Sequence, residues 1–565
     1  MGNVSLRSGT TTIPLSYQCI GQVLDDTAAR FPDHPALVTC EQRTRYTYRQ
    51  LLQETERVAR GLLALGVRKG DRVGIWAANC AEWVLVQFAT AKLGAVLVNI
   101  NPSFQGRELR QTLHHSGCGT LIMMSGFRDL DYLQIFHSIC PESRDHEPGA
   151  LKSKDLPTLR NVILVGDATP THMMIFSDLQ RKAEDVTLRE LRLVEEGLDS
   201  QEPINIQYTS GTTGAPKGAC LTHHNIVNNA MFVGTCMKVS NADKVCIPVP
   251  FYHCFGMVLG NMCCVTVGAT MVVPGGAFDP LAVLQAVERE QCTVLYGVPT
   301  MFIAQLERLE HETFDTSTLR TGIMSGSYCP LELMKRVVRD MHCAGITVAY
   351  GLTEASPVIT QTALEDPLEL RVSTVGKPLP HTEVKIASLV DGTPVQCGNE
   401  GELCTRGYLV MKEYYDDRKA TEQAIDSEGW LHTGDLATMD EEGYVRITGR
   451  IKDIIIRGGE NIYPGEIEEF IRTCKDVIDI QVFGIPSRKY GEQVVAWVKL
   501  RPGSSLSSEH IRQFCKGNIA HYKIPRYVVI VDEFPMTVTG KIKKFEMRAM
   551  TTALLDPAEG VNKTV

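Results

Sequence analysis

The sequence lacks the cysteine patterns that are typical of disulfide scaffolds and of zinc sites. Its 18 cysteines include no CxxC pair, and their spacing follows no regular framework. A disulfide scaffold is therefore not expected. The adjacent pair Cys263 and Cys264 fits neither a zinc site nor a plausible disulfide. We interpret the cysteines as reduced core residues of an intracellular protein.

Strong charge of either sign is also missing. The net charge is -9, 22% of the residues are charged, and no tract has low complexity. This balance offers no electrostatic attraction to nucleic acid or to an anionic membrane, so a bound anion must be held by local geometry. With 44% hydrophobic residues the chain has the composition of a soluble globular protein, and its 565 residues predict two or more domains.

No Asp, Glu, Lys or Arg occurs between Val245 and Phe278. A membrane span is one interpretation of this segment. Pro248, Pro250 and Pro274, together with several glycines, divide it into pieces that are too short to span a bilayer. We therefore expect a buried helix and strand here, and no transmembrane segment.

Acidic residues are absent from the first 24 positions as well. A transit peptide shares this property, but Arg7 is the only basic residue here, and the apolar centre of a signal peptide is missing. The N-terminal sequence taken alone is therefore compatible with the cytosol.

What the chain does contain is a glycine- and hydroxyl-rich stretch, YTSGTTGAPKG, from Tyr208 to Gly218. Glycines let backbone N–H groups approach phosphate oxygens, hydroxyls donate hydrogen bonds, and a lysine adds positive charge. The stretch therefore predicts a polyphosphate cradle. Its residues are Thr209, Ser210, Gly211, Thr212, Thr213, Gly214, Ala215, Pro216 and Lys217.

This cradle differs from the Walker loop, in which lysine directly follows the last glycine. Here Ala215 and Pro216 intervene, so an ATPase or GTPase of the Walker class is disfavoured. A flexible Ser/Thr/Gly linker is the alternative. The flanking sequence disfavours it too, because an alternating strand (204–208) precedes the stretch and a helix is expected to open at Thr222.

Strands and helices alternate along the first half of the chain. Thr47 to Gln50 forms a capping box before a helix, and Gly94 is placed to end the helix after it. Further strands are expected at 73–76, 95–99, 120–124 and 161–165, and a polar helix at 179–194. This order predicts an α/β fold with doubly wound, mostly parallel sheets.

Later apolar runs each end in a Gly-, Ser- or Tyr-containing turn, at Gly322–Ser325 and Thr347–Tyr350 among others. In open α/β sheets ligands bind beyond the carboxyl ends of the strands, so these turns should face one crevice. After Gly376 the pattern predicts a small antiparallel unit. A small, mobile α+β domain should follow, which gives a large N-terminal domain at 1–449 and a C-terminal domain at 450–565.

Six motifs follow in a fixed order over most of the chain: YTSGTTGAPKG (208–218), YGLTE (350–354), GELCTRG (401–407), HTGD (432–435), GRIKD (449–453) and PMTVTGKIKK (535–544). Together they resemble the adenylate-forming superfamily of acyl-CoA synthetases, luciferases and nonribosomal-peptide adenylation domains, from about residue 20 to about 550. The sequence is most similar to the medium-chain fatty-acyl-CoA synthetases.

The resemblance implies an ATP- and Mg²⁺-dependent enzyme that makes acyl-AMP and then acyl-CoA. Glu354 matches the family's magnesium ligand, and Thr353 should donate to the α-phosphate. Tyr350 should stack on adenine beside Gly326 and Ser327. By the same resemblance, the ribose is expected to meet Asp435 and Arg450.

The family's catalytic lysine corresponds to Lys541, which also belongs to the ATP-binding set. A solvated lysine in a basic run is the alternative. For the second half-reaction the resemblance implies a hinge at Lys452 and backbone contact of the pantetheine arm of coenzyme A with Gly458 and Gly459.

His253 matches a gate beside the acyl carboxylate, and its neighbours are apolar. This predicts a fatty acid, with aryl or branched acids as alternatives. Other acceptors, such as a carrier protein, and a non-catalytic ligand-binding relative are also open. The expected partners are small molecules, not nucleic acid. The resemblance favours the mitochondrial matrix, with the cytoplasm as the alternative.

Overall fold

The structure is a computed structural model that describes residues 3–146, 149–166, 173–209, 217–457, 460–487, 490–536 and 542–554. The chain separates into two compact units. The larger comprises Arg7–Val384 and Thr405–Leu431. The smaller comprises the first few residues, Lys385–Cys404 and the chain from His432 onward. The predicted domain boundary at 449/450 stays a prediction.

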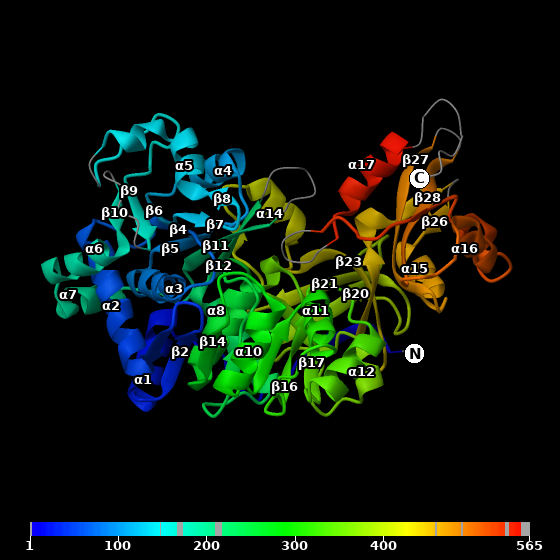
Figure 1. Cartoon of the computed structure of the whole chain (residues 1–565), viewed down its shortest axis with the longest axis horizontal. Helices are drawn as coiled ribbons and strands as arrows, with labels where there is room; N and C mark the ends of the chain where they lie inside the picture. The colour runs from blue at the N-terminus through cyan, green and yellow to red at the C-terminus, as the bar shows by residue number, and fades with distance from the viewer. Residues whose placement is uncertain are drawn as a thin grey trace. The chain divides into compact units, whose positions relative to one another are not determined.

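An eight-stranded sheet forms one half of the larger unit (Figure 1). Its strands, in spatial order, are β10 (Met174–Ile175), β9 (Asn161–Val165), β6 (Thr120–Met124), β4 (Arg72–Trp76), β5 (Val96–Asn99), β11 (Pro203–Thr209), β12 (Lys217–Thr222) and β22 (Glu413–Tyr414). The first six are parallel, and β12 and β22 are antiparallel to their neighbours.

A nine-stranded sheet forms the other half. Its strands, in spatial order, are β19 (Lys377–Pro378), β18 (Val358–Gln361), β17 (Gly345–Gly351), β16 (Thr321–Ser325), β15 (Val294–Gly297), β13 (Lys244–Cys246), β14 (Thr270–Val273), β2 (Pro35–Thr39) and β3 (Thr44–Thr47). The strands from β17 to β2 are parallel. A two-stranded sheet pairs β7 (Gly126–Phe127) with β8 (Leu130–Asp131).

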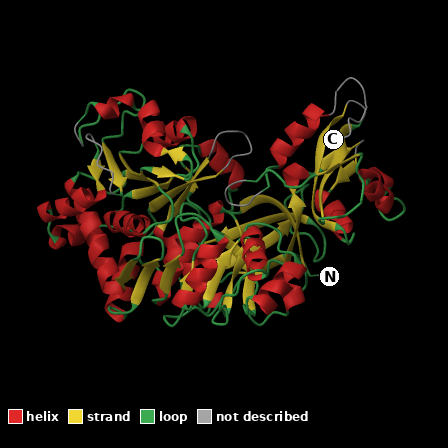
Figure 2. Cartoon of the chain, in the orientation of Figure 1, coloured by secondary structure: helices red, strands yellow, loops and turns green. Residues whose placement is uncertain are grey.

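Helices pack against both large sheets (Figure 2). They are α1 (Ile20–Arg30), α2 (Tyr48–Ala64), α3 (Ala81–Leu93), α4 (Gly106–Ser116), α5 (Tyr132–Ile139), α6 (Phe176–Arg181), α7 (Leu188–Glu196), α8 (His223–Cys236), α9 (Cys263–Val267), α10 (Pro280–Glu290), α11 (Pro299–Leu309), α12 (Leu331–Asp340), α13 (Leu368–Ser373) and α14 (Arg418–Ala424). Helix α3 is buried along nearly its whole length, which marks it as a central core helix.

Two further sheets complete the fold. One follows the order β1 (Leu6–Ser8), β20 (Thr382–Ala387), β21 (Gly401–Gly407), β23 (Leu431–Met439) and β24 (Val445–Arg450). The other comprises β26 (Glu460–Ile462), β25 (Ile455–Arg457), β28 (Gly491–Leu500), β27 (Val477–Ser487) and β29 (Tyr527–Ile530). Its helices are α15 (Pro464–Arg472), α16 (Ser508–Cys515) and α17 (Lys544–Leu554).

The predicted α/β class, with parallel-rich sheets and an antiparallel sheet, is confirmed. Local signals located several elements well. The Thr47 side chain accepts from Gln50 N and caps α2, and Gly94 ends α3 in the left-handed conformation with φ of 66°. Thr222 likewise caps α8. In each case the residue satisfies backbone groups that a helix end leaves unpaired.

One local prediction was wrong. The stretch 179–194 is not one helix but α6, a 3₁₀ turn and α7, because Thr187 caps a new helix through Glu190. The helix that was expected to open at Thr222 is confirmed as α8, whereas β12, which precedes it and pairs with β11 and β22, was not predicted. Such pairing joins segments far apart in the chain, and local pattern carries no signal for it.

The uncharged segment 245–278 is buried as expected. It contains β13, a π-helical segment η3 (Phe255–Met262), α9 and β14, and each piece is short. Among the described residues, no helix combines the length and apolarity that crossing a bilayer requires. None of the 18 cysteines, all of which are described, is in a disulfide, and most are buried, which agrees with the interpretation as reduced core residues.

Candidate active site

The phosphate stretch connects two antiparallel strands. Residues Ser210 to Pro216 lie outside the described part of the chain, whereas both flanks are described. Thr209 at the end of β11 pairs with Lys217 at the start of β12, and the Thr209 hydroxyl donates to the Lys217 carbonyl at 3.4 Å. Thr209 and Lys217 are thereby held side by side at the two ends of the segment 210–216.

Glu354 is anchored beside this hairpin. It lies in η4 (Thr353–Ala355), the 3₁₀ turn after β17, and is 9% exposed. The Tyr414 hydroxyl donates to Glu354 Oε1 at 2.7 Å, and Met411 N donates to the Glu354 carbonyl at 2.8 Å. Burial, followed by the Glu354 charge, raises the pKa of Tyr414, so the hydroxyl remains a donor.

Lys217 reaches the same cluster from β12. Its Nζ lies 4.9 Å from the centre of the Tyr414 ring, which is a cation–π distance. Ala219 of β12 also pairs with Tyr414 of β22, so the strand pairing itself sets the position of the ring. The structure therefore brings together a predicted phosphate-binding lysine and a predicted metal ligand through a tyrosine.

Tyr350, Gly326 and Ser327 lie at the carboxyl ends of two adjacent parallel strands. Ser325 of β16 pairs with Ala349 of β17, and the Ser325 hydroxyl donates to the Ala349 carbonyl at 2.6 Å. Gly326 adopts φ of 93°, which lets the chain turn away from the strand. Gly326 and Ser327 are exposed, and Tyr350 is half-buried. The ends of β16 and β17 thus lie at the same edge of the sheet, and the crevice that they are expected to face stays a prediction.

His253 is half-buried in the turn before η3. Its N–H donates to the Pro250 carbonyl at 3.2 Å, and its carbonyl accepts from Met257 N at 2.9 Å. The rings of Tyr252 and His253 lie 5.0 Å apart. Burial raises the pKa of the thiol of the next residue, Cys254, and the Glu354 charge adds to this effect.

Polar residues that the sequence analysis missed support the His253 turn. The Cys254 thiol donates to Gln207 Oε1 at 3.1 Å, and Asn99 Nδ2 donates to the Tyr252 carbonyl at 3.1 Å. Gln207 and Asn99 come from the neighbouring strands β11 and β5. The Tyr252 hydroxyl is buried without a hydrogen-bond partner among the described residues. A polar residue at a strand end was the signal that could have found Asn99.

In the smaller unit, Asp435 and Arg450 are paired across β23 and β24. They are register partners, and Arg450 Nε lies 2.9 Å from Asp435 Oδ1. Asp435 is almost buried, whereas half of the Arg450 side chain is exposed. The two residues predicted to contact the ribose are thus brought together.

Lys452 occupies the centre of η5 (Ile451–Asp453), the 3₁₀ turn between β24 and β25. Burial lowers the pKa of Lys452, and the Arg450 charge adds to this effect. Asp453 at the end of the turn pairs with Arg548 of α17 at 3.1 Å. Lys541, Gly458 and Gly459 lie outside the described residues, so their predicted roles stay predictions.

The donor set around Glu354 fits a magnesium ion that carries a nucleotide. Mg²⁺ is held through one or two carboxylates together with substrate phosphates and waters. Glu354 supplies one buried carboxylate, and Oε1 already accepts from Tyr414, an outer-shell arrangement that orients a ligand. Thr353 beside it is half-buried and provides a hydroxyl.

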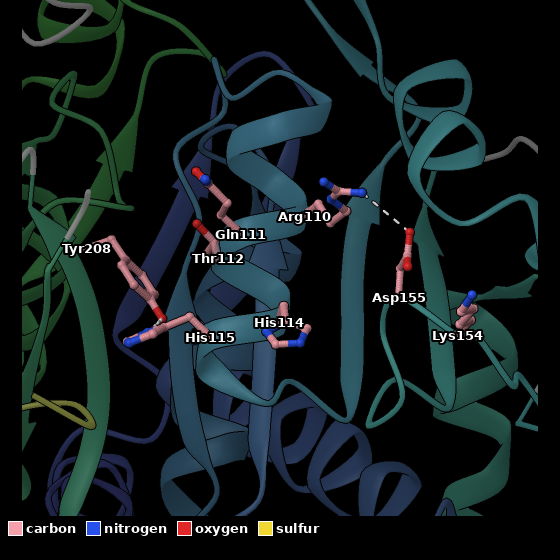
Figure 3. Close-up of a pocket in the computed structure, with 8 residues that line it drawn as sticks. All are labelled: Arg110, Gln111, Thr112, His114, His115, Lys154, Asp155 and Tyr208. Carbon is pink, nitrogen blue, oxygen red and sulfur yellow. Dashed lines mark hydrogen bonds and ion pairs between the residues drawn. The ribbon is translucent and has the colours of Figure 1, made fainter. Parts of the chain in front are cut away.

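A separate cavity of about 570 Å³ opens beside α4 (Figure 3). It is lined by Arg110, Gln111, Thr112, His114, His115, Lys154, Asp155 and Tyr208. His115 and Tyr208 point toward one another, with Nδ1 2.8 Å from the hydroxyl, while Arg110 pairs with Asp155 at 3.4 Å. Among the described residues that are predicted to bind ATP, none lines this cavity, and Tyr208 directly precedes the phosphate stretch.

Comparison with known proteins places the chain in the AMP-binding enzyme family. Residues 24–415 match the AMP-binding enzyme family, and residues 466–541 match the AMP-binding enzyme C-terminal domain. The putative acyl-CoA synthetase YngI of Bacillus subtilis (strain 168) is 51% identical, over 96% of this chain and 98% of its own length.

A second relative is the mitochondrial medium-chain acyl-CoA ligase ACSF2 of Bos taurus. It is 42% identical, over 97% of this chain and 90% of its own length. Among solved structures, ATP-bound MatB from Rhodopseudomonas palustris superposes with a TM-score of 0.80 at 25% identity, covering 94% of this chain and 99% of that one.

Proposed function

Because this chain belongs to the AMP-binding enzyme family, we propose that it joins medium-chain fatty acids to coenzyme A through an acyl-adenylate. It is an AMP-forming acid–thiol ligase of the acyl-CoA synthetase type, for which ATP and coenzyme A are substrates. The preference for medium-chain acids is our proposal. The similarity to a medium-chain ligase over 97% of this chain supports it.

The observation that carries the chemistry is the buried Glu354 carboxylate, which Tyr414 holds beside Lys217. In the first half-reaction the fatty-acid carboxylate attacks the α-phosphorus of ATP, and the bond to pyrophosphate breaks. Lys217 and the hydroxyls of the phosphate stretch hold the β- and γ-phosphates, and Thr353 donates to the α-phosphate. Mg²⁺, held by Glu354, would neutralise charge on the departing pyrophosphate.

The nucleoside has its own set of residues. Tyr350 stacks on the adenine, with Gly326 and Ser327 along the edge of the base. In the smaller unit, Asp435 accepts from the ribose hydroxyls, and Arg450 holds Asp435 in place. The distance of 2.9 Å between Arg450 Nε and Asp435 Oδ1 supports this assignment.

Lys541 is proposed to stabilise the negative charge that develops between the attacking carboxylate and the α-phosphate. In the second half-reaction the thiol of coenzyme A attacks the acyl-AMP carbonyl, and AMP leaves. We assign the pantetheine contact to the backbone at Gly458 and Gly459. Lys452 is the proposed hinge that absorbs the conformational change between the two steps. The chain thus divides into 1–449 and 450–565.

Apolar side chains around His253 support a fatty acid as substrate. Phe251, Met257 and Val258 are buried around the His253 turn, and Phe255 is partly buried. An apolar site accepts an alkyl chain, although each methylene changes the discrimination by only about 1–3 kcal/mol. The mitochondrial matrix is the compartment we propose, by similarity to ACSF2, and the bacterial relative YngI makes the cytoplasm the alternative.

The test measures release of pyrophosphate and AMP from ATP over a panel of straight-chain fatty, aryl, branched and amino acids, each with and without coenzyme A. We expect turnover that depends on coenzyme A and is fastest with medium-chain acids. Fastest turnover on another acid class would replace the proposed substrate. A single burst of acyl-AMP that coenzyme A does not accelerate would point to another acceptor, and silence across the panel would contradict the ligase.

A further inference from the structure

Three side chains of different chemistry meet on the sheet that contains β21 and β23. Glu402 and Cys404 are two residues apart on β21, so their side chains lie on the same face of the strand. His432 comes from β23, the next strand of that sheet. Its Nδ1 lies 2.8 Å from Glu402 Oε2 and 3.5 Å from Cys404 Sγ. The three donor atoms all lie within 4.8 Å of one another.

These separations suit a small tetrahedral cation. Zinc bonds of about 2.3 Å to sulfur and about 2.0–2.2 Å to nitrogen or oxygen place tetrahedral donors about 3.4–3.6 Å apart. The Cys404–His432 separation of 3.5 Å already has this value. The His432–Glu402 separation of 2.8 Å has to open by roughly half an ångström, because it is now a hydrogen bond.

Neighbouring groups hold the Glu402 carboxylate in place, and the partly exposed His432 leaves the cluster accessible to a cation. Glu402 Oε1 accepts from Gly434 N at 3.0 Å, so its other oxygen stays turned toward His432. Cys404 is fully buried, whereas the His432 side chain is 33% exposed and the Glu402 side chain 15% exposed. A cation would enter past His432, with water as its fourth ligand.

We propose that Glu402, Cys404 and His432 form a binding site for a thiophilic divalent cation, of which Zn²⁺ is the best match. A thiolate with an imidazole selects Zn²⁺ over Mg²⁺ or Ca²⁺, which prefer oxygen ligands. The site is distinct from the magnesium position proposed at Glu354, which has oxygen donors. His432 lies on β23, three residues before Asp435, and so on the strand that carries a proposed ribose contact.

The experiment titrates the full-length protein with Co²⁺ at pH 8, where ligand deprotonation favours binding. Co²⁺ takes the place of Zn²⁺ and absorbs in the near ultraviolet when a thiolate binds it. We expect this charge-transfer band to saturate at one equivalent and to disappear when Zn²⁺ is added. Cys404→Ser should remove the band. His432→Gln should weaken Co²⁺ binding by at least about 100-fold, the upper end of what loss of an outer-shell partner alone costs.

Cys474→Ser is the matched control, because Cys474 is a free, half-buried cysteine of the same unit outside the cluster. It should keep the band of the wild type. Thermal melts of each variant without metal separate loss of the site from loss of the fold. Absence of the band in the wild type, or its persistence in a folded Cys404→Ser variant, would overturn the proposal.

Discussion

The hydroxyl of Tyr414 donates a hydrogen bond of 2.7 Å to the carboxylate of Glu354. Tyr414 comes from a two-residue strand, and Glu354 from a 3₁₀ turn 60 residues earlier in the chain. The contact directs a buried carboxylate and makes Tyr414 a positioning residue for the proposed magnesium ligand.

Replacing Tyr414 by Phe removes only this hydroxyl. Because outer-shell partners typically contribute 10- to 100-fold to metal affinity or activity, we expect the Mg²⁺ concentration for half-maximal adenylation to rise by about 10-fold. Pyrophosphate release as a function of Mg²⁺ measures it. Tyr415→Phe is the control, since it removes a hydroxyl from the adjacent residue and should leave the dependence unchanged. An unaltered Mg²⁺ dependence in Tyr414→Phe would show that the contact is structural.

Lys541→Ala should slow acyl-AMP formation by about 100- to 1,000-fold, because one charge donor at the reacting phosphate is lost. Thioester formation from preformed acyl-AMP should be largely spared. The two half-reactions are measured separately. Lys543→Ala is the control from the same basic run, because Lys543 is paired with Glu546 at 2.9 Å. Equal loss in both half-reactions would contradict the assigned role.

Lys452→Pro should impair the second half-reaction selectively. Proline fixes φ at its own position and disfavours the helical conformation of the residue before it, and Ile451 begins η5. We expect thioester formation to slow by about 10-fold or more relative to adenylation, because the hinge can no longer absorb the change. Lys452→Ala separates hinge stiffness from loss of charge. If Lys452→Pro turned over normally, residue 452 would not be the hinge.

His223 predicts a pH dependence of stability. Burial lowers the pKa of His223 to about 3, and its Nδ1 accepts a hydrogen bond from Ile20 N at 3.1 Å, as a neutral imidazole does. The unfolded chain binds a proton near pH 6.5 and the folded chain only near pH 3. The unfolded state therefore binds more protons within this window, and stability falls as the pH falls from 6.5 toward 3.

The expected loss from this residue is about 1.6 kcal/mol between pH 6.5 and pH 5, because the slope rises from half of 1.36 kcal/mol per pH unit at pH 6.5 toward that full value. Thermal melts of the wild type and His223→Gln at both pH values measure it, and the variant should lose less stability over the interval. His114→Gln, at an exposed position on α4, is the control. Parallel pH profiles for wild type and His223→Gln would contradict the assignment.

Elements with a complete local signal were predictable from the amino-acid sequence. The capping box at Thr47, the left-handed Gly94 and the Thr222 cap each involve residues within one helical turn. Alternation of apolar runs and turns was enough to predict that the ends of β16 and β17 meet near Tyr350. The ordered motifs identified the family, which residues 24–415 and 466–541 match.

The sequence by itself determined the fold class, the family and most candidate site residues, because helix caps, side-chain periodicity and motif order are local properties. Only the tertiary structure decided that β12 lies between β11 and β22, that Tyr414 meets Glu354, and that Glu402 and Cys404 meet His432. These relations depend on strand pairing and burial between segments far apart in the chain. No pattern within one segment encodes which distant partner the packed core will bring beside it.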